Sequence, residues 1–224
     1  MKTVLITGAG QRLGKSIAEA FAQQGYNLIL HYHKSKKETE KLAKKLGAKL
    51  IQGDLQKPKS VEKMFQKTGP VDIVVNTIGG FIYTPLSKTS PQEFEECIAN
   101  NLFIAYRIAH VVIPLFHKRK FGRLINFGSV GCDQITSRPL TTPYYIGKTG
   151  LFMLTKTLAQ ELQNTNITVN MVTPGVLPTG VKPAKGIPLI PFDDVAKAVL
   201  FLASEEMNSF NGTNLEISGG WRPE

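Results

Sequence analysis

Residues 3–14 read TVLITGAGQRLG, and this stretch decides the fold. It joins a short apolar run to a glycine-rich turn, and apolar side chains at helical spacing follow (Leu13, Ile17, Ala20, Phe21). A strand, a glycine turn and an amphipathic helix in this order predict the first βα unit of a parallel sheet. Glycines let the backbone approach a pyrophosphate, which amide N–H groups at the helix N-terminus then bind. The same pattern also occurs as a tight connection that binds nothing.

The apolar run at 3–7 is the first of seven such segments, and helical patterns separate them. The segments are rich in Val and Ile and nearly continuous in hydrophobicity, which is typical of strands buried on both faces. The sequence therefore predicts an α/β protein, one Rossmann-type domain over residues 1–224 with a doubly wound parallel sheet of about seven strands. The expected strands are residues 3–7, 27–32, 49–54, 71–76, 122–127, 167–172 and 214–218.

The helices between these strands are bounded by residues that favour helix ends. Ser90, followed by Pro91 and Glu93, predicts a helix that starts at Pro91, runs toward His117 and is kinked near Pro114. Two more helices are expected, over residues 144–163 and from 193 or 194 to 202.

The composition points to a cytoplasmic protein. The chain has 224 residues, of which 42% are hydrophobic, enough for a full core. We expect no membrane span, because no apolar run approaches 18 residues, and no secretory signal. The two cysteines, Cys97 and Cys132, are expected to be free thiols.

The net charge of +10 raises the question of a nucleic-acid partner. Between His31 and Lys67 there are eleven lysines and four acidic residues, so this segment alone carries +7. It lacks interleaved aromatic residues and a recognisable DNA-reading helix. We therefore expect solvated helix faces there and no specific nucleic acid.

Tyr144 and Lys148 form the clearest catalytic pair in the sequence. They stand four residues apart on an expected helix, so their side chains lie on one face. A nearby cation favours the phenolate form of a tyrosine, which assists proton transfer near neutral pH. Tyr145 has Thr149 at the same spacing, so Tyr145→Phe is expected to be nearly silent. The alternative is that Tyr144 and Lys148 share a helix face by chance and have no catalytic role.

The motifs, taken in order, resemble those of the short-chain dehydrogenases/reductases from Lys2 to Trp221. The glycine turn resembles that family's TGxxxGxG loop, with Arg12 in place of the middle glycine. Asn76-Thr77-Ile78-Gly79 resembles its Asn-Asn-Ala-Gly motif but departs from it at the two central residues. Residues 174–191, with five Pro and three Gly, resemble a short substrate loop beside the nicotinamide, expected to be mobile without ligand.

This resemblance implies four catalytic residues. Tyr144 would donate the proton, and Ser129 would position the substrate oxygen. Lys148 would bind ribose hydroxyls and lower the pKa of Tyr144. Asn101 would support a proton relay through a water molecule.

The resemblance also implies NADP(H) as the cofactor. Arg12 and the string His31-Tyr32-His33-Lys34-Ser35 look like the pteridine-reductase branch, and no acid follows the second strand to accept a ribose 2′-OH. Arg12 and Lys34 are expected to bind a 2′-phosphate, although both could be ordinary surface cations. His31 and His33 have no third ligand nearby, so no metal site is expected. The expected cofactor residues are Gly8, Gly10, Gln11, Arg12, Leu13, Gly14, His33, Lys34, Ser35, Asp54, Leu55, Asn76, Gly79, Tyr144, Lys148, Pro174, Gly175 and Val176.

The implied activity is NADPH-dependent hydride transfer to a carbonyl group of a small substrate, such as a 3-oxoacyl group or another ketone. Two alternatives stay open: a pteridine or dihydropteridine reductase, and a catalytically silent NADP(H)-binding sensor or scaffold. Pteridine reductases of that branch commonly carry Asp where this chain has Ser129. The resemblance further implies a homodimer or homotetramer packed through the helices of Asn101 and Tyr144.

Overall fold

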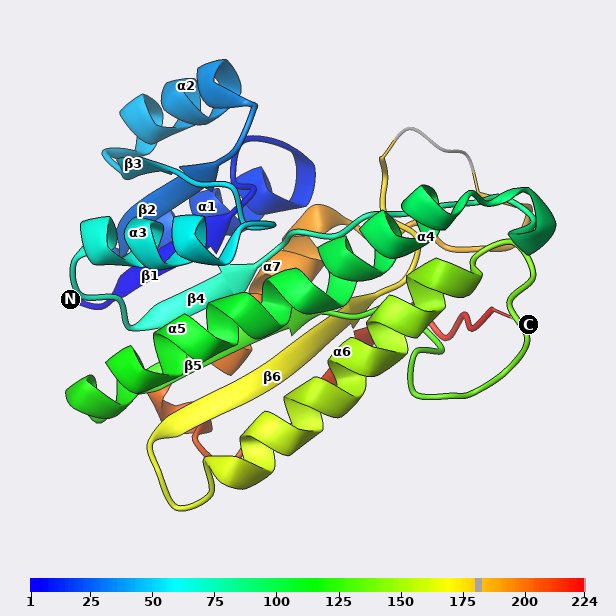
Figure 1. The fold of residues 1–224 in the computed structure, drawn as a ribbon. Coiled ribbons are helices and arrows are strands. Elements are labelled where there is room, and N and C mark those ends of the chain that lie inside the picture. Colours follow the sequence, from blue (N-terminus) through cyan, green and yellow to red (C-terminus); the bar gives the residue numbers. More distant parts are fainter. Residues whose placement is uncertain (180–182, 224) are drawn as a thin grey trace.

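A seven-stranded parallel sheet forms the centre of the computed structural model, which describes residues 1–179 and 183–223. The strand order is β3-β2-β1-β4-β5-β6-β7, and every neighbouring pair is parallel (Figure 1). The predicted class and strand number are confirmed. The strands are β1 (Thr3–Thr7), β2 (Asn27–Tyr32), β3 (Lys49–Gln52), β4 (Ile73–Asn76), β5 (Gly122–Phe127), β6 (Ile167–Pro174) and β7 (Asn214–Ile217).

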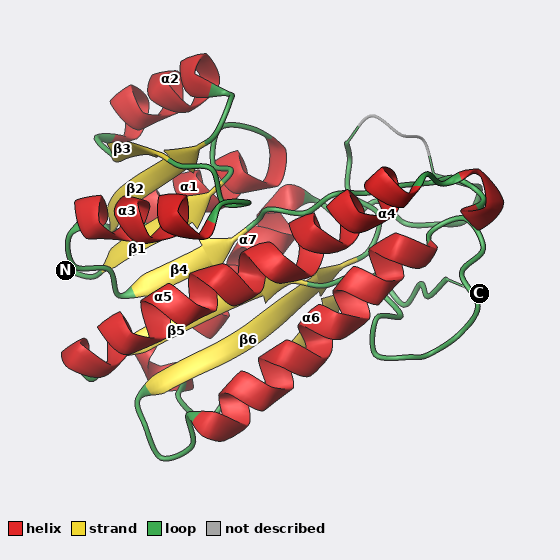
Figure 2. Cartoon of the chain, viewed as in Figure 1, coloured by secondary structure: helices red, strands yellow, loops and turns green. Residues whose placement is uncertain are grey.

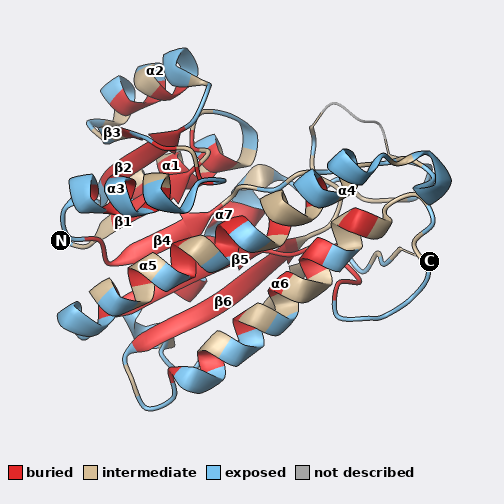
Figure 3. Ribbon diagram, in the orientation of Figure 1, coloured by how far each residue is buried: buried red, intermediate tan, exposed pale blue. Residues whose placement is uncertain are grey.

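Helices cover both faces of this sheet (Figure 2). One apolar core lies between the sheet and α1, α2 and α7, and a second lies between the opposite face and α3 and α5, with α6 beside it. The central strands are buried along their length, as their continuous hydrophobicity predicted (Figure 3). The helices are α1 (Arg12–Gln23), α2 (Lys36–Leu46), α3 (Pro58–Thr68), α4 (Pro91–Ile98), α5 (Ile104–Arg119), α6 (Thr142–Glu161) and α7 (Phe192–Ala203).

Several element ends differ from the sequence prediction. β3 stops at Gln52 and β4 starts at Ile73, so both are shorter than expected, whereas β6 continues to Pro174. Pairing with the neighbouring strand sets these limits, and a single sequence does not contain that information.

The helix predicted from Pro91 toward His117 is present but not uniform. Its start is confirmed, because Ser90 and Glu93 form the reciprocal hydrogen bonds of a capping box. One wide turn, η2 (Ala99–Phe103), has π-helical hydrogen bonding and separates α4 from α5. No sequence signal predicted this turn, and π turns of this kind are frequent at functional sites.

The same helical stretch has a composition that bears on the expectation of no membrane span. Residues Pro91–Arg119 are long and apolar enough, by length and composition, to cross a membrane. The stretch contains no uninterrupted apolar run near 18 residues, because scattered polar residues separate the apolar ones. Ile104, Ile108, Val112 and Phe116 pack against the sheet, which is the ordinary behaviour of a core helix.

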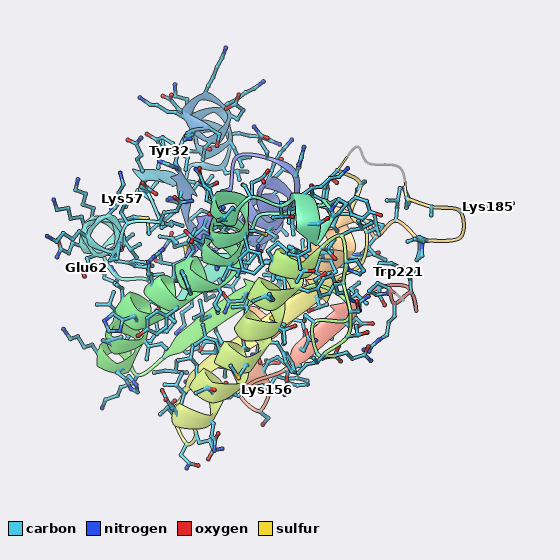
Figure 4. All side chains as sticks on the ribbon, turned by 45° about the vertical axis from the view of Figure 1, so that its right-hand side comes forward. Tyr32, Lys57, Glu62, Lys156, Lys185 and Trp221 are labelled. Atoms are coloured by element: carbon cyan, nitrogen blue, oxygen red, sulfur yellow. The ribbon has the colours of Figure 1, made fainter. Side chains whose placement is uncertain are left out.

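The lysine-rich segment behaves as predicted. All eleven lysines between His31 and Lys67 are exposed, on α2, α3, the start of β3 and the adjoining loops. Figure 4 shows Glu62 extending from α3 into solvent, and Lys57 extending from the position just before that helix. Lys44 pairs with Glu40 and Lys57 with Asp54, so part of the charge is balanced locally.

The predicted substrate loop has a fixed base. Val176 and Leu189 form an isolated bridge, and the Ile190 N–H donates to the Val176 carbonyl at 2.8 Å. Residues 180–182, at the centre of the loop, lie outside the described residues. Figure 4 shows Lys185 on the projecting part that follows them.

Candidate active site

The candidate site residues gather where the strand order reverses. β1 lies between β2 and β4, and chain segments leave the carboxyl ends of β1 and β4 toward opposite faces of the sheet. Ligands of open α/β sheets bind at this edge. The glycine turn follows β1, Asn76 ends β4, Ser129 follows β5 and Pro174 ends β6.

The turn after β1 has the shape of an anion-binding loop. Gly8 has φ +60°, in the region that glycine adopts without steric cost. A Cβ at Gly14 would lie 2.5 Å from the Gly8 carbonyl oxygen, so α1 can pack this closely only without a side chain there. Gln11 caps α1 without a side-chain hydrogen bond, which leaves the first-turn N–H groups of α1 available to a phosphate. The residues at this turn therefore fit a dinucleotide.

Arg12 begins α1 with φ +49°, in the left-handed region. This conformation costs a residue with a Cβ roughly 1–2 kcal/mol. The glycine that the related family has at this position would avoid that cost. The side chain is exposed. Retention of a strained residue at a binding loop suggests that its side chain has a function.

His31 fixes the glycine turn to the next strand. Its Nδ1 accepts a hydrogen bond from the Gly8 N–H at 3.3 Å, and its Nε2 lies 3.0 Å from the Gly53 carbonyl oxygen. Because the carbonyl can only accept, the proton resides on Nε2. Burial lowers the pKa of His31 to about 4, so the ring stays neutral at physiological pH.

This environment predicts that His31 makes stability depend on pH. Its pKa falls from 6.5 in the unfolded chain to about 4 in the fold, so its contribution is complete above pH 6.5 and disappears as the pH falls to 4. The free energy of unfolding should fall by about 3 kcal/mol over this pH range because of His31. In denaturant titrations between pH 7 and 4, His31→Gln should lose less stability than the unmodified protein. His33→Gln, at an exposed position, is the control, and identical pH slopes in all three proteins would contradict this role.

His33, Lys34 and Ser35 follow β2 beside the glycine turn. The Ala9 N–H donates to the His31 carbonyl, and Gly10 packs against Thr39 in the first turns of α2. His33 and Lys34 are exposed and Ser35 is partly buried. Their placement suits recognition of a group on the adenosine ribose.

Asn76 lies buried inside a network that joins three strands. Its Oδ1 accepts from the Thr7 hydroxyl at 3.1 Å, and its Nδ2 donates to Asn126 Oδ1 at 3.2 Å. Thr77, one of the departures from the family pattern, adds a second connection, since its hydroxyl donates to the Thr7 carbonyl at 2.5 Å. Thr7 and Thr77 thus support the loop, and sequence reasoning did not single them out.

Asp54 and Leu55 follow β3. One Asp54 carboxylate oxygen accepts from the Gln56 N–H at 3.0 Å, and the other lies 3.5 Å from Lys57 Nζ. Leu55 is buried in the core. This carboxylate therefore already has local partners before any adenine contact.

The first turns of α6 bring Tyr144 and Lys148 to one place. Lys148 Nζ lies 5.7 Å from the centre of the Tyr144 ring and donates to the Phe127 carbonyl at 2.6 Å. Burial lowers the pKa of Lys148 to about 8. Burial also raises the pKa of Tyr144, and a hydrogen bond with Ser129 opposes that rise. Ser129, Tyr144 and Lys148 thus lie together. The expected lowering of the Tyr144 pKa by Lys148 is not seen, because burial dominates and raises this pKa.

Asn101 joins this group through the π turn. Its Nδ2 donates to the Gly80 carbonyl at 2.7 Å and to the Cys97 carbonyl at 2.8 Å. Its buried Oδ1 has no hydrogen-bond partner among residues 1–179 and 183–223. A Cβ at Gly79 would lie 2.9 Å from this Oδ1 and 3.4 Å from Lys148 Nζ. Both polar groups therefore face the same space beside Gly79, and an unsatisfied buried acceptor there suits a bound water molecule.

Pro174, Gly175 and Val176 continue from β6 along the same edge. The Gly175 N–H donates to the Ile217 carbonyl at 2.8 Å, and a Cβ on Gly175 would lie 3.1 Å from the Ser218 Cα. Close packing against β7 thus fixes the start of the loop.

An exposed aromatic pair borders the site. Phe81 and Tyr83, in the segment after β4, are each 68% exposed and stack with their centroids 6.4 Å apart. Phe81 also meets Tyr144 edge to face at 5.0 Å. Large exposed aromatic side chains commonly mark contact surfaces.

Tyr145 also contacts the site, which sequence reasoning missed. Its hydroxyl donates to the Val130 carbonyl at 2.8 Å and lies 3.4 Å from Ser129 Oγ. Helical spacing alone pairs Tyr145 with Thr149. It does not show that the segment after β5, which contains Ser129 and Val130, lies against Tyr145.

The remaining reactive groups are the two cysteines and the side chains that could bind a metal. Cys97 and Cys132 are free and buried, and burial raises the pKa of both thiols. Within residues 1–179 and 183–223, no three metal-ligating side chains come together.

Comparison with known proteins agrees with this geometry. The chain is 32% identical to the 3-oxoacyl-[acyl-carrier-protein] reductase FabG of Staphylococcus epidermidis, covering 98% of both proteins. It is equally identical to the 3beta-hydroxysteroid dehydrogenase 1 of Eggerthella lenta, covering 98% of this chain and 93% of that protein.

Solved structures give the same result. A dehydrogenase/reductase from Sinorhizobium meliloti superposes with a TM-score of 0.87 at 28% identity, covering 98% of this chain and 94% of that one. A short chain dehydrogenase/reductase family protein superposes with a TM-score of 0.90 at 26% identity, covering 98% and 96%. The sequence model described as short chain dehydrogenase matches residues 2–186. The chain therefore belongs to the short-chain dehydrogenase family of oxidoreductases.

Proposed function

We propose that the protein reduces a carbonyl group of a small substrate with NADPH. The observation that carries this proposal is the meeting of Asn101 Oδ1 and Lys148 Nζ beside Gly79, next to Ser129 and Tyr144. A proton donor, a cation and a vacant acceptor for water are thus within one small volume. This arrangement suits proton delivery to an oxyanion.

NADPH, when bound, supplies the hydride. The first-turn N–H groups of α1 would bind the pyrophosphate, and Arg12, Lys34 and Ser35 would bind the 2′-phosphate. Two points support the phosphate: no acid follows β2, and Arg12 keeps a strained backbone where glycine would be relaxed. Lys148 would bind ribose hydroxyls close to Tyr144.

The protein's own groups would perform the proton chemistry. Ser129 would hydrogen-bond the substrate oxygen, and Tyr144 would give that oxygen a proton as negative charge develops on it. Lys148 would stabilise the resulting phenolate, and Asn101 would hold the water that returns a proton. Each role matches the position that the side chain occupies.

The relatives support a 3-oxoacyl thioester as the substrate, since the 3-oxoacyl-[acyl-carrier-protein] reductase of S. epidermidis matches along nearly its full length. The hydroxysteroid dehydrogenase of E. lenta matches at the same identity. A ketone is the group common to both substrate classes.

A dihydropteridine is the second candidate substrate. Phe81 favours it, because its exposed ring beside Tyr144 offers a flat apolar surface to a planar heterocycle. Ser129 favours a ketone over a pteridine, because pteridine reductases of the related branch commonly carry Asp at this position.

A cofactor-oxidation assay separates these candidates. NADPH is incubated with the protein and, in turn, with a 3-oxoacyl thioester, a hydroxysteroid-derived ketone and a dihydropteridine. Oxidation of NADPH with a ketone supports the main proposal, and oxidation with the dihydropteridine alone supports the second. Binding of NADPH without turnover of any substrate would favour a silent sensor or scaffold.

The low pKa of Lys148 predicts how activity depends on pH. Lys148 is an ammonium below pH 8 and becomes neutral above it, whereas Tyr144 keeps its proton because its pKa is raised. We expect kcat/KM for NADPH to fall above about pH 8. Lys148→Arg should keep the cation and move the falling limb to higher pH. Lys156→Ala, at an exposed position of α6, is the control, and an unmoved limb in Lys148→Arg would exclude Lys148 as its source.

We also propose a cytoplasmic homodimer or homotetramer packed through α4, α5 and α6. Large side chains are exposed at the end of η2, on α5 and on α6: Phe103, Tyr106, Ile146 and Met153. Their burial between subunits would remove them from water.

A further inference from the structure

Tyr145 and Ser129 form a chain of hydrogen bonds that ends on the protein backbone. The Tyr145 hydroxyl has one proton, and it donates this proton to the Val130 carbonyl at 2.8 Å. Its oxygen therefore offers only lone pairs to Ser129 Oγ, 3.4 Å away. Ser129 can donate toward Tyr145 and must then accept from any other hydroxyl. The partner on its other side is the hydroxyl of Tyr144.

The ring of Tyr145 is held from several sides. The Tyr145 N–H donates to the Thr141 carbonyl at 3.0 Å. The Arg138 guanidinium lies over its ring, 4.6 Å from the centroid, and the Tyr144 ring meets it edge to face at 5.5 Å. A hydroxyl on a ring fixed in this way is a rigid reference point for Ser129.

We propose that Tyr145 is a positioning residue that acts through Ser129. The inference rests on the proposed reduction, because it concerns how Ser129 reaches the substrate oxygen. The 2.8 Å bond to Val130 fixes the Tyr145 oxygen, and the longer 3.4 Å contact orients the Ser129 hydroxyl without holding it tightly. A substrate oxygen then takes the Ser129 proton at little cost, while Oγ stays within reach of Tyr144. Tyr145→Phe is thus not the silent change that helical spacing suggested.

Tyr145→Phe tests this proposal, because it keeps the ring and its contacts and removes only the hydroxyl. Without the Tyr145 hydroxyl, Ser129 should populate rotamers that do not reach the substrate oxygen. A preference of about 0.5–1.5 kcal/mol, the size of one neutral hydrogen bond, corresponds to a fall in kcat of roughly 2- to 12-fold. KM for NADPH should not change, since Tyr145 is absent from the proposed cofactor contacts. Tyr26→Phe, just before β2 at the edge of the sheet opposite the site, is the matched control and should leave kcat unchanged.

A double-mutant cycle distinguishes positioning from a general structural effect. If Tyr145 acts through Ser129, then Tyr145→Phe should cause no further loss in kcat once Ser129→Ala is present. The same fold-loss in both backgrounds would overturn the proposal.

A second measurement does not depend on turnover. Crystals of Tyr145→Phe should show the Ser129 side chain in more than one rotamer, whereas the unmodified protein should show one. A single unchanged rotamer would overturn the positioning role. Absence of turnover in the unmodified protein would instead count against the proposed reduction, so the two failures are distinguishable.

Discussion

We expect Tyr144→Phe to lower kcat by about 10²–10⁴-fold, because the variant loses the positioned general acid. The fold should persist, since the ring still meets Phe81 edge to face and still lies near Lys148 Nζ. The Kd for NADPH should change little, because most proposed cofactor contacts lie at the glycine turn and after β2. Stopped-flow turnover and fluorescence titration of NADPH measure the two quantities separately.

The matched control for this experiment is Tyr26→Phe, just before β2 at the edge of the sheet opposite the site. It makes the same chemical change outside the site and should leave kcat and Kd unaffected. Full turnover in Tyr144→Phe would show that another group donates the proton.

The second large effect concerns the choice of cofactor. NADPH should bind more tightly than NADH, and Arg12→Gly combined with Lys34→Ala should remove most of that preference. Hydrogen bonds to charged groups contribute roughly 1.5–3 kcal/mol each. Two phosphate contacts therefore give a preference for NADPH of about 10²–10⁴-fold, before screening by salt reduces this preference. Glycine is the sharper replacement at position 12, because it relaxes the backbone at φ +49° while removing the cation.

Titration with both cofactors at several salt concentrations tests this prediction. The variant should lose affinity for NADPH, keep its affinity for NADH and show a flatter salt dependence. Its melting temperature should not fall, because the strain at residue 12 is relieved. Lys41→Ala, on the exposed side of α2, controls for general charge. Equal affinity of the unmodified protein for NADPH and NADH would refute the 2′-phosphate assignment.

Sequence reasoning predicted those parts of the fold that depend on local pattern. The continuous apolar runs gave the seven strands, and Ser90-Pro91 with Glu93 gave the start of α4. The pair Tyr144 and Lys148 followed from helical spacing, because one turn of a helix places both on the same face.

The remaining features depend on contacts between distant segments. Asn101 reaches the site through a π turn whose sequence, Ala99–Phe103, has no signature of its own. His31 supports the glycine turn only because β2 lies beside β1, and Tyr145 meets Ser129 only because the segment after β5 returns to α6. Lateral pairing of this kind cannot be derived from one sequence.

Deuterium transfer tests the central claim most directly. NADPH carrying deuterium at the transferable position of its nicotinamide is incubated with the protein and a 3-oxoacyl thioester, and the product is examined by mass spectrometry and NMR. We predict one deuterium on the carbon that was the ketone, with NADP⁺ formed in equal amount. Tyr144→Phe should reduce the rate without changing the position of the label. Bound NADPH that is never oxidised by this substrate, another ketone or a dihydropteridine would contradict the assignment of this protein as a reductase.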